Sequence, residues 1–165
     1  MPHPSAAQEI TGLHIDLTLS TEDDDPPLLG WLDIMLARAA ELAGVCRGQL
    51  GLAIVADAEM ADLHQNYKSV SGTTDVLTFD LCETPTPGHV EGDIVLCLDE
   101  ARRQAAARDH TVRQEMLLYA IHGLLHLLGE DDLDEEAYQR MHAREDELLR
   151  ALGVGPVFSR ETRPD

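Results

Sequence analysis

Aromatic residues are scarce in this sequence, where phenylalanine, tryptophan and tyrosine together make up 4% of 165 residues. Hydrophobic residues still account for 44%, so the core must consist mainly of leucine, valine, isoleucine and alanine. The length suits one domain, and a charged fraction of 26% is ordinary for a globular protein. We therefore expect one domain over residues 10–155, between flexible termini at residues 1–9 and 156–165.

Cysteines are also few, and long apolar runs are absent from the sequence. Three widely spaced cysteines without a CxxC pair exclude a disulfide framework and predict reduced, mostly buried thiols in a cytoplasmic protein. They are Cys46, Cys82 and Cys97. The first residues lack the basic start and apolar stretch of a secretory signal. The most apolar helical segment, residues 31–45, carries three charged side chains, which excludes a membrane span there.

Basic residues are outnumbered, because one lysine and eleven arginines stand against 31 acidic residues, for a net charge of −19. Such a balance repels phosphate at long range and argues mildly against a nucleic-acid partner. A bound dication and a few local arginines can nevertheless reverse the field in one groove. Four arginines oppose a single acid between residues 102 and 113, and they form either an RNA-facing strip or, more ordinarily, a solvated helix face. They are Arg102, Arg103, Arg108 and Arg113.

Hydrophobic periodicity defines the expected secondary structure. Residues 13–19 alternate apolar and polar side chains, as a half-buried strand does. The acidic run and prolines of residues 22–27 suit a helix start, Gly44 suits its end, and Asp57 is placed to cap the next helix. We expect strands at 13–19, 50–56, 75–79 and 92–97, and helices ending at 44 and spanning 57–67, 99–109, 111–128 and 133–151. This order predicts an α/β or α+β domain around one sheet.

The stretch from His122 to Asp132 has the spacing of a metal site. His122 and His126 are four residues apart on an expected helix, so both imidazoles can reach one ion. Gly129 can end the helix in a left-handed conformation and turn the chain back, which brings Asp132 toward the same ion. Three protein ligands with a fourth position left open are typical of a catalytic zinc. The alternative is a chance histidine pair that binds no ion.

The same stretch also invites comparison with zinc peptidases of the H-E-x-x-H-x-x-G-x-x-H/D kind. In those enzymes the residue after the first histidine is a glutamate that activates water. Here that residue is Gly123, which carries no base. A metallopeptidase is therefore the less favoured interpretation.

In combination, the motifs of this sequence resemble the YbeY family of bacterial rRNA-maturation endoribonucleases. Residues 122–132 are similar to the family signature H-G-x-L-H-L-x-G-Y-D-H. Residues 64–80 are similar to N-x-x-Y-R-x-x-D-x-P-T-D-V-L-S-F-P, and residues 92–95 to the G-D-I-V strand. Met141 and Glu145 fall where the family has M-x-x-x-E.

The resemblance implies a mixed, roughly four-stranded sheet flanked by about five helices, with zinc held by His122, His126 and Asp132. It implies cleavage of single-stranded RNA at the 3′ end of small-subunit rRNA, a role in ribosome quality control, and contact with the small subunit. Lys68 would meet substrate phosphate and, with His122, serve catalysis. Asp132 and Lys68 replace the family's histidine and arginine, and the harder carboxylate favours Mn or Mg more than three histidines do. A non-catalytic, metal-stabilised ribosome-assembly factor is the alternative function.

Several other residues are candidates for supporting roles. Glu115 and Tyr119 lie near the helical face of His122, where either side chain can orient a metal ligand. The alternative is that Glu115 is an ordinary solvated acid and Tyr119 an ordinary residue at the edge of the core. His142 is a rival third ligand, for which an exposed surface position is the expected alternative. The other histidines have no second candidate ligand at a metal-binding spacing, so we expect them on the surface or in strands. They are His14, His64, His89 and His110.

Overall fold

The computed structural model describes residues 12–21 and 26–155. The predicted flexible termini and the acidic run 22–25 lie outside these residues. In chain order the elements are β1 (Leu13–Ser20), α2 (Pro26–Leu42), β2 (Arg47–Val55), α3 (Asp57–Lys68), β3 (Val76–Asp80), β4 (His89–Cys97), α4 (Leu98–Arg108), α5 (Val112–Leu127) and α6 (Glu135–Ala151). The expected elements are all found, and β2 and β4 each begin three residues earlier than predicted.

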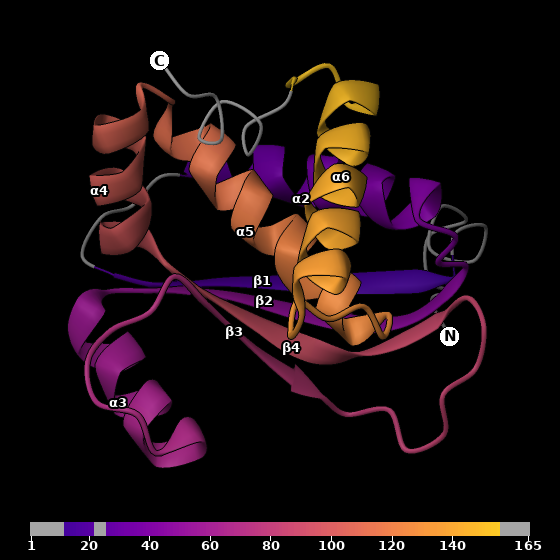
Figure 1. Ribbon diagram of the computed structural model, residues 1–165, viewed down its shortest axis with the longest axis horizontal. Coiled ribbons are helices and arrows are strands. Elements are labelled where there is room, and N and C mark those ends of the chain that lie inside the picture. The colour runs from indigo at the N-terminus through magenta and orange to yellow at the C-terminus, as the bar shows by residue number, and fades with distance from the viewer. Residues whose placement is uncertain (1–11, 22–25, 156–165) are drawn as a thin grey trace, which may run out of the picture.

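The four strands form one mixed sheet in the order β1-β2-β4-β3. Strands β1, β2 and β4 are parallel to one another, while the short β3 pairs antiparallel with β4. Figure 1 shows helices α2, α4, α5 and α6 over one face of the sheet and α3 on the other. The protein is thus a single α+β domain with a mixed four-stranded sheet and five helices among the described residues, as expected.

The two faces of the sheet are covered unequally because successive side chains of a strand point to opposite faces. The apolar residues of β1, such as Leu17, pack with the main core under the four helices. The alternate residues Asp16 and Thr18 line a groove on the face that α3 covers only in part. A smaller cluster around Val95 and Met60 joins α3 to that face. The main core therefore lies on the α5 side of the sheet.

Helix α5 is the central element of the helical layer. It begins with a capping box, in which the Thr111 side chain accepts from the Gln114 backbone and the Gln114 side chain accepts in return. It packs against α2, α4 and α6 and against strands β3 and β4. Most of its residues are buried, so its position is fixed on several sides at once.

Two sequence-based expectations are corrected by the structure. Asp57 does not cap α3, because Ala56 holds the cap position without a side-chain hydrogen bond. The Asp57 carboxylate instead accepts two 2.8 Å hydrogen bonds from Arg103, which lower its pKa to about 2 and tie α3 to α4. The cysteines are free, as expected, but only Cys97 is buried. Within the described residues, no helix combines the length and apolar character that a membrane span requires.

Gly123 brings α5 close to the sheet. A Cβ atom at this position would lie 2.8 Å from Ile94 Cγ2 and 3.1 Å from Thr78 Cγ2, closer than such contacts allow. Both neighbours are β-branched side chains with little rotational freedom. The space beside His122 thus has room for glycine alone, and it has no room for the glutamate of a zinc peptidase.

We predict that Gly123→Ala lowers the free energy of unfolding by about 1–3 kcal/mol through overpacking, despite the higher helix propensity of alanine. Gly30→Ala in α2 is the matched control, because no atom lies within 4 Å of a Cβ built there. That control should raise stability by about 0.5–1 kcal/mol. Urea unfolding of both variants measures the difference, and equal stabilisation by the two substitutions would contradict the close approach.

Candidate metal centre

The side chains of His122, His126 and Asp132 converge at the carboxyl end of α5. Gly129, with φ of +97°, turns the chain back after the helix so that Asp132 faces the two histidines, as the spacing predicted. The two Nε2 atoms lie 3.0 Å apart. Asp132 Oδ2 lies 3.8 Å from His122 Nε2, and Oδ1 lies 3.9 Å from His126 Nε2. Since tetrahedral bonds of about 2.0–2.1 Å place ligand atoms roughly 3.3 Å apart, small side-chain shifts allow all three to share one ion.

The opposite nitrogen of each imidazole is engaged by a fixed acceptor. His122 Nδ1 lies 2.5 Å from Glu145 Oε1, and His126 Nδ1 lies 3.0 Å from the backbone oxygen of Glu130. Each Nδ1 must carry a proton to donate to these oxygens, which turns both Nε2 atoms toward the shared point with Asp132. An imidazole held through Nδ1 by a carboxylate or a carbonyl is the usual arrangement of a histidine that binds metal through Nε2.

The pKa values of the two histidines indicate that this point favours one positive charge. Burial lowers the pKa of His122, but the hydrogen bond and charge of Glu145, with the charge of Asp132, raise it above its ordinary value overall. Burial and the neighbouring His122 lower the pKa of His126. One proton between the two Nε2 atoms can therefore satisfy both rings, and a metal ion replaces that proton when it binds. The donor set thus fits a divalent ion.

Glu145 joins His122 to a second histidine, His142. The Glu145 side chain is fully buried, and its Oε2 lies 2.5 Å from His142 Nδ1. The ring of His142 stacks against that of His122, with centroids 5.9 Å apart and planes 17° from parallel. His142 was expected on the exposed surface, and this expectation is wrong, since only 12% of its side chain is exposed. His142, Glu145 and His122 form a second group with metal-ligand spacing in the described residues.

A cavity of about 320 Å³ is lined by two of the three converging side chains, His122 and Asp132. Its polar wall comes from five elements or loops and includes Asp75, Arg108, Tyr119, Asp132, Tyr138 and His142. Lys68 is not part of this wall; it is exposed at the last residue of α3. Its contact with substrate therefore stays a prediction. Arg108 was considered from sequence only as one of four arginines in a possible RNA-facing strip, and Asp75 was not considered for the site, because neither has a fixed spacing from the histidines.

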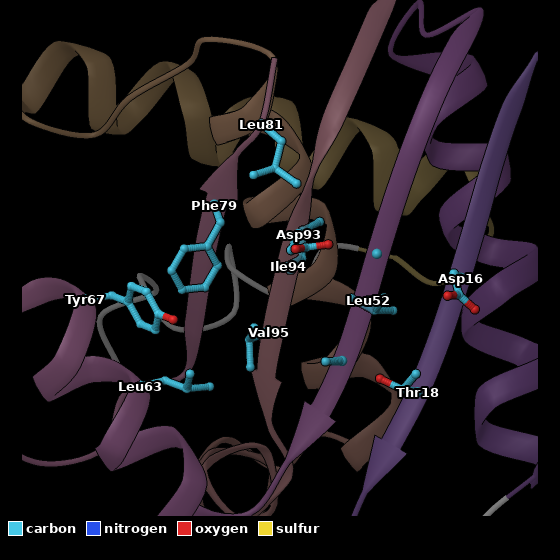
Figure 2. Close-up of a pocket in the computed structure, with 12 residues that line it drawn as sticks. Asp16, Thr18, Leu52, Leu63, Tyr67, Phe79, Leu81, Asp93, Ile94 and Val95 are labelled. Carbon is cyan, nitrogen blue, oxygen red and sulfur yellow. The ribbon is translucent and has the colours of Figure 1, made fainter. Parts of the chain in front are cut away.

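A larger groove of about 480 Å³ lies on the other face of the sheet, beside α3. Figure 2 shows Asp16 on β1 and Asp93 on β4 at this surface, with the rings of Tyr67 and Phe79 to one side. The two carboxylates belong to one cross-strand row, with Gly51 of β2 between them. No group with metal-ligand spacing occurs there among the described residues, so the smaller cavity on the α5 side is the candidate site.

The remaining sequence-based candidates are distributed among structural roles. Glu115 is not a solvated acid; it is fully buried and contacts His110 Nδ1 at 3.0 Å and Arg108 at 3.4 Å. The His110 side chain is fully buried as well, which corrects the expectation of a surface position. The four arginines between residues 102 and 113 do not share one strip, since three of them contact partners away from the cavity. Arg102 pairs with Asp99, Arg103 with Asp57 and Glu100, and Arg113 lies over Trp31.

Comparisons with known proteins agree with the geometry of the site. The model of the family described as Endoribonuclease YbeY matches residues 22–153. Endoribonuclease YbeY of Desulfitobacterium hafniense is 31% identical over 153 residues, covering 84% of this chain and 98% of that protein. This chain belongs to the YbeY family. Endoribonuclease YbeY of Mycolicibacterium gilvum is 41% identical over 110 residues, a match that spans 61% of this chain and 62% of that relative.

The fold of the YbeY family is also found in a solved structure. The solution structure of TM1509 from Thermotoga maritima has a TM-score of 0.58 and covers 92% of this chain and 99% of that one. At 24% sequence identity, this likeness supports the fold alone.

We predict that Glu145→Gln weakens metal affinity by about 10- to 100-fold, because the amide group cannot accept from both Nδ1–H donors. Competition with a chromogenic chelator measures the affinity. Glu147→Gln is the matched control, since that glutamate is 69% exposed and pairs only on the surface with Arg144. Equal metal affinities in the two variants and the wild type would show that Glu145 does not orient a metal ligand.

Proposed function

We propose that this protein is an endoribonuclease that cuts single-stranded RNA with one divalent ion held by His122, His126 and Asp132. Its relatives bear the name endoribonuclease, which supports RNA as the substrate. We further propose that it acts in the cytoplasm on small-subunit rRNA, at the 3′ end, in rRNA maturation and ribosome quality control. The small ribosomal subunit is its expected partner.

The convergence of two Nε2 atoms and one carboxylate beside an open cavity carries this proposal. Two of the three groups, His122 and Asp132, are part of the cavity wall, so a phosphodiester in the cavity would lie next to an ion that they hold. A closed structural site would instead surround its ion with four protein ligands. Two imidazoles and a carboxylate suit zinc, and the carboxylate makes Mn or Mg more acceptable than three imidazoles would.

A divalent ion in this position would supply Lewis-acid polarisation of a phosphodiester oxygen and would activate water near neutral pH. The residues of the chain hold the geometry for that chemistry. Glu145 fixes the ring of His122, and the Glu130 carbonyl fixes the ring of His126. His122 thus serves both as a ligand and as the link to the buried carboxylate of α6.

We predict that His126→Ala removes stoichiometric metal and abolishes RNA cleavage while the protein stays folded, because the apolar core does not include this half-exposed side chain. His122→Ala should also lose the metal, with an added loss of stability because one buried oxygen of Glu145 loses its partner while the other stays bonded to His142. Elemental analysis, near-ultraviolet circular dichroism and a single-stranded RNA cleavage assay measure the three properties. His14→Ala on β1 is the control that should keep its metal. A full metal equivalent bound with native affinity in either site variant would exclude this metal centre.

A non-catalytic assembly factor with a structural ion predicts a different response to chelation. A structural ion stabilises the folded state directly, so its removal should lower the melting temperature strongly. Such a protein should cleave no RNA, whether or not the ion is bound. The proposed enzyme should lose cleavage on chelation, melt at a less altered temperature, and recover activity when the metal is restored. Thermal melting and cleavage measured on the same chelated samples separate the two functions.

Lys68 stays a predicted phosphate contact outside the cavity wall. We expect Lys68→Ala to slow RNA cleavage by about tenfold, the lower end of the range for a hydrogen bond to a charged group, with unchanged metal content. Lys68→Arg should keep most activity or raise it, because guanidinium can bind two phosphate oxygens at once. Equal rates in all three proteins would remove Lys68 from the substrate-binding surface.

A further inference from the structure

Helix α5 carries a polar stripe that extends beyond the metal centre toward the start of the helix. Glu115, Tyr119, His122 and His126 follow one another at intervals of three or four residues, which places them on one face. Tyr119 lies one turn before His122, about 4.5 Å along the helix axis. A group bound beside Tyr119 is therefore next to the metal centre without contacting its ligands.

Arg108, the last residue of α4, lies over the start of this stripe. Its Nη1 is 3.4 Å from Oε2 of Glu115, which is fully buried. That ion pair is longer than the 2.8 Å contact between Arg103 and Asp57. About a third of the Arg108 side chain is exposed, and it forms part of the cavity wall. Glu115 thus positions a guanidinium that a ligand in the cavity can reach.

The Tyr119 hydroxyl is buried and makes no hydrogen bond of ordinary length and angle within the described part of the chain, although Glu115 lies close enough to interact with it weakly. The side chain is 4% exposed and forms part of the same cavity wall as Arg108. Burial, with the negative charge of Glu115, raises the pKa of Tyr119, so the hydroxyl keeps its proton. Buried polar groups almost always have a partner, so this donor at the cavity wall is available to water or to a ligand in the cavity.

Arg108 and Tyr119 also line a second cavity of about 270 Å³ that adjoins the first. Two carboxylates face this space, and both accept hydrogen bonds from the protein. Asp75 Oδ1 accepts from the backbone N–H of residue 76 at 2.8 Å, and Glu100 accepts from Gln104 at 2.9 Å and from an arginine at 3.0 Å. Thr74 and Gln104 also line the cavity, but their side chains donate to these two carboxylates. The guanidinium and the hydroxyl are therefore the remaining donors that this space offers to an anion.

We propose that Arg108 and Tyr119 form a subsite for one RNA phosphate, adjacent to the phosphate that is cut at the metal centre. The inference rests on the proposed function. It adds that the bound RNA strand runs from the metal centre along α5 toward the end of α4. The guanidinium supplies a charge-assisted hydrogen bond to the phosphate, and the tyrosine supplies a neutral one. A phosphate here would accept from the Tyr119 hydroxyl and would be a second anionic partner for Arg108 beside Glu115.

The test is binding of a fluorescein-labelled RNA oligonucleotide with a phosphorothioate backbone, shown by gel to stay uncut, to the zinc-loaded protein, followed by fluorescence anisotropy across a salt series. Arg108→Gln should weaken binding by about 10- to 100-fold. It should also lower the slope of log affinity against log salt by about 0.7, the loss of one phosphate contact to a single strand. Arg108→Lys should recover that slope. Arg102→Gln, on the same helix but outside the cavity wall, should bind as the wild type does.

Tyr119→Phe distinguishes binding from stability, because it removes only a hydroxyl that makes no hydrogen bond of ordinary length and angle in the free protein. The variant should melt at the same or a higher temperature and bind RNA about 2- to 10-fold more weakly. Wild-type affinity in both Tyr119→Phe and Arg108→Gln, with wild-type RNA cleavage intact, would overturn the subsite and leave the proposed function standing. A wild-type protein that neither binds nor cleaves RNA would instead overturn the proposed function and the subsite with it.

Discussion

The close contact between α5 and the sheet at Gly123 determines where the functional side chains lie. Because no side chain separates the helix from Ile94 and Thr78, α5 lies directly on strands β3 and β4. His122 lies next to that contact and His126 one turn further along the helix, and the turn at Gly129 brings Asp132 to both of them. The packing thus supplies a rigid support for three ligands from one local segment.

Helix α6 completes the centre through a single buried carboxylate. Glu145 is surrounded by the apolar face of α6, and burial alone would raise its pKa. Hydrogen bonds from His122 and His142 lower it instead, so the group stays ionised. A buried charge of this kind is costly unless it is paired, and its two imidazole partners offset that cost. The same carboxylate therefore holds α6 against α5 and sets the orientation of a metal ligand.

Local patterns were sufficient for the parts of the site that come from one segment. The spacing of His122, His126 and Asp132 follows from helix geometry and a glycine stop, and the three side chains converge as that geometry requires. Glu145 and Arg108 lie on other helices, and their proximity depends on tertiary packing that no periodicity reports. Two signals were nevertheless available for Glu145. It falls, with Met141, where the family has M-x-x-x-E. It occupies a position in the buried stripe of α6, with Met141 and Leu148, where an acid has no reason to be unless it has a partner.

The acidic composition is compatible with an RNA substrate when the positions of the charged side chains in the structure are considered. Of the four arginines near the end of α4, Arg108 is the one that forms part of the wall of the metal-site cavity. The others contact acids or Trp31 elsewhere on the surface. A divalent ion would add two positive charges beside Arg108, so one groove of a chain with net charge −19 could attract phosphate. Under the proposed function, the metal ion would contribute to RNA binding as well as to the chemistry.

The most direct test of this account is a crystal structure of the zinc-loaded protein with anomalous scattering at the zinc edge. The account predicts one ion bound to His122 Nε2, His126 Nε2 and an oxygen of Asp132, each at about 2.0–2.2 Å. An ion bound instead by His142 and Glu145, or an Asp132 oxygen more than about 3 Å from the ion, would contradict it.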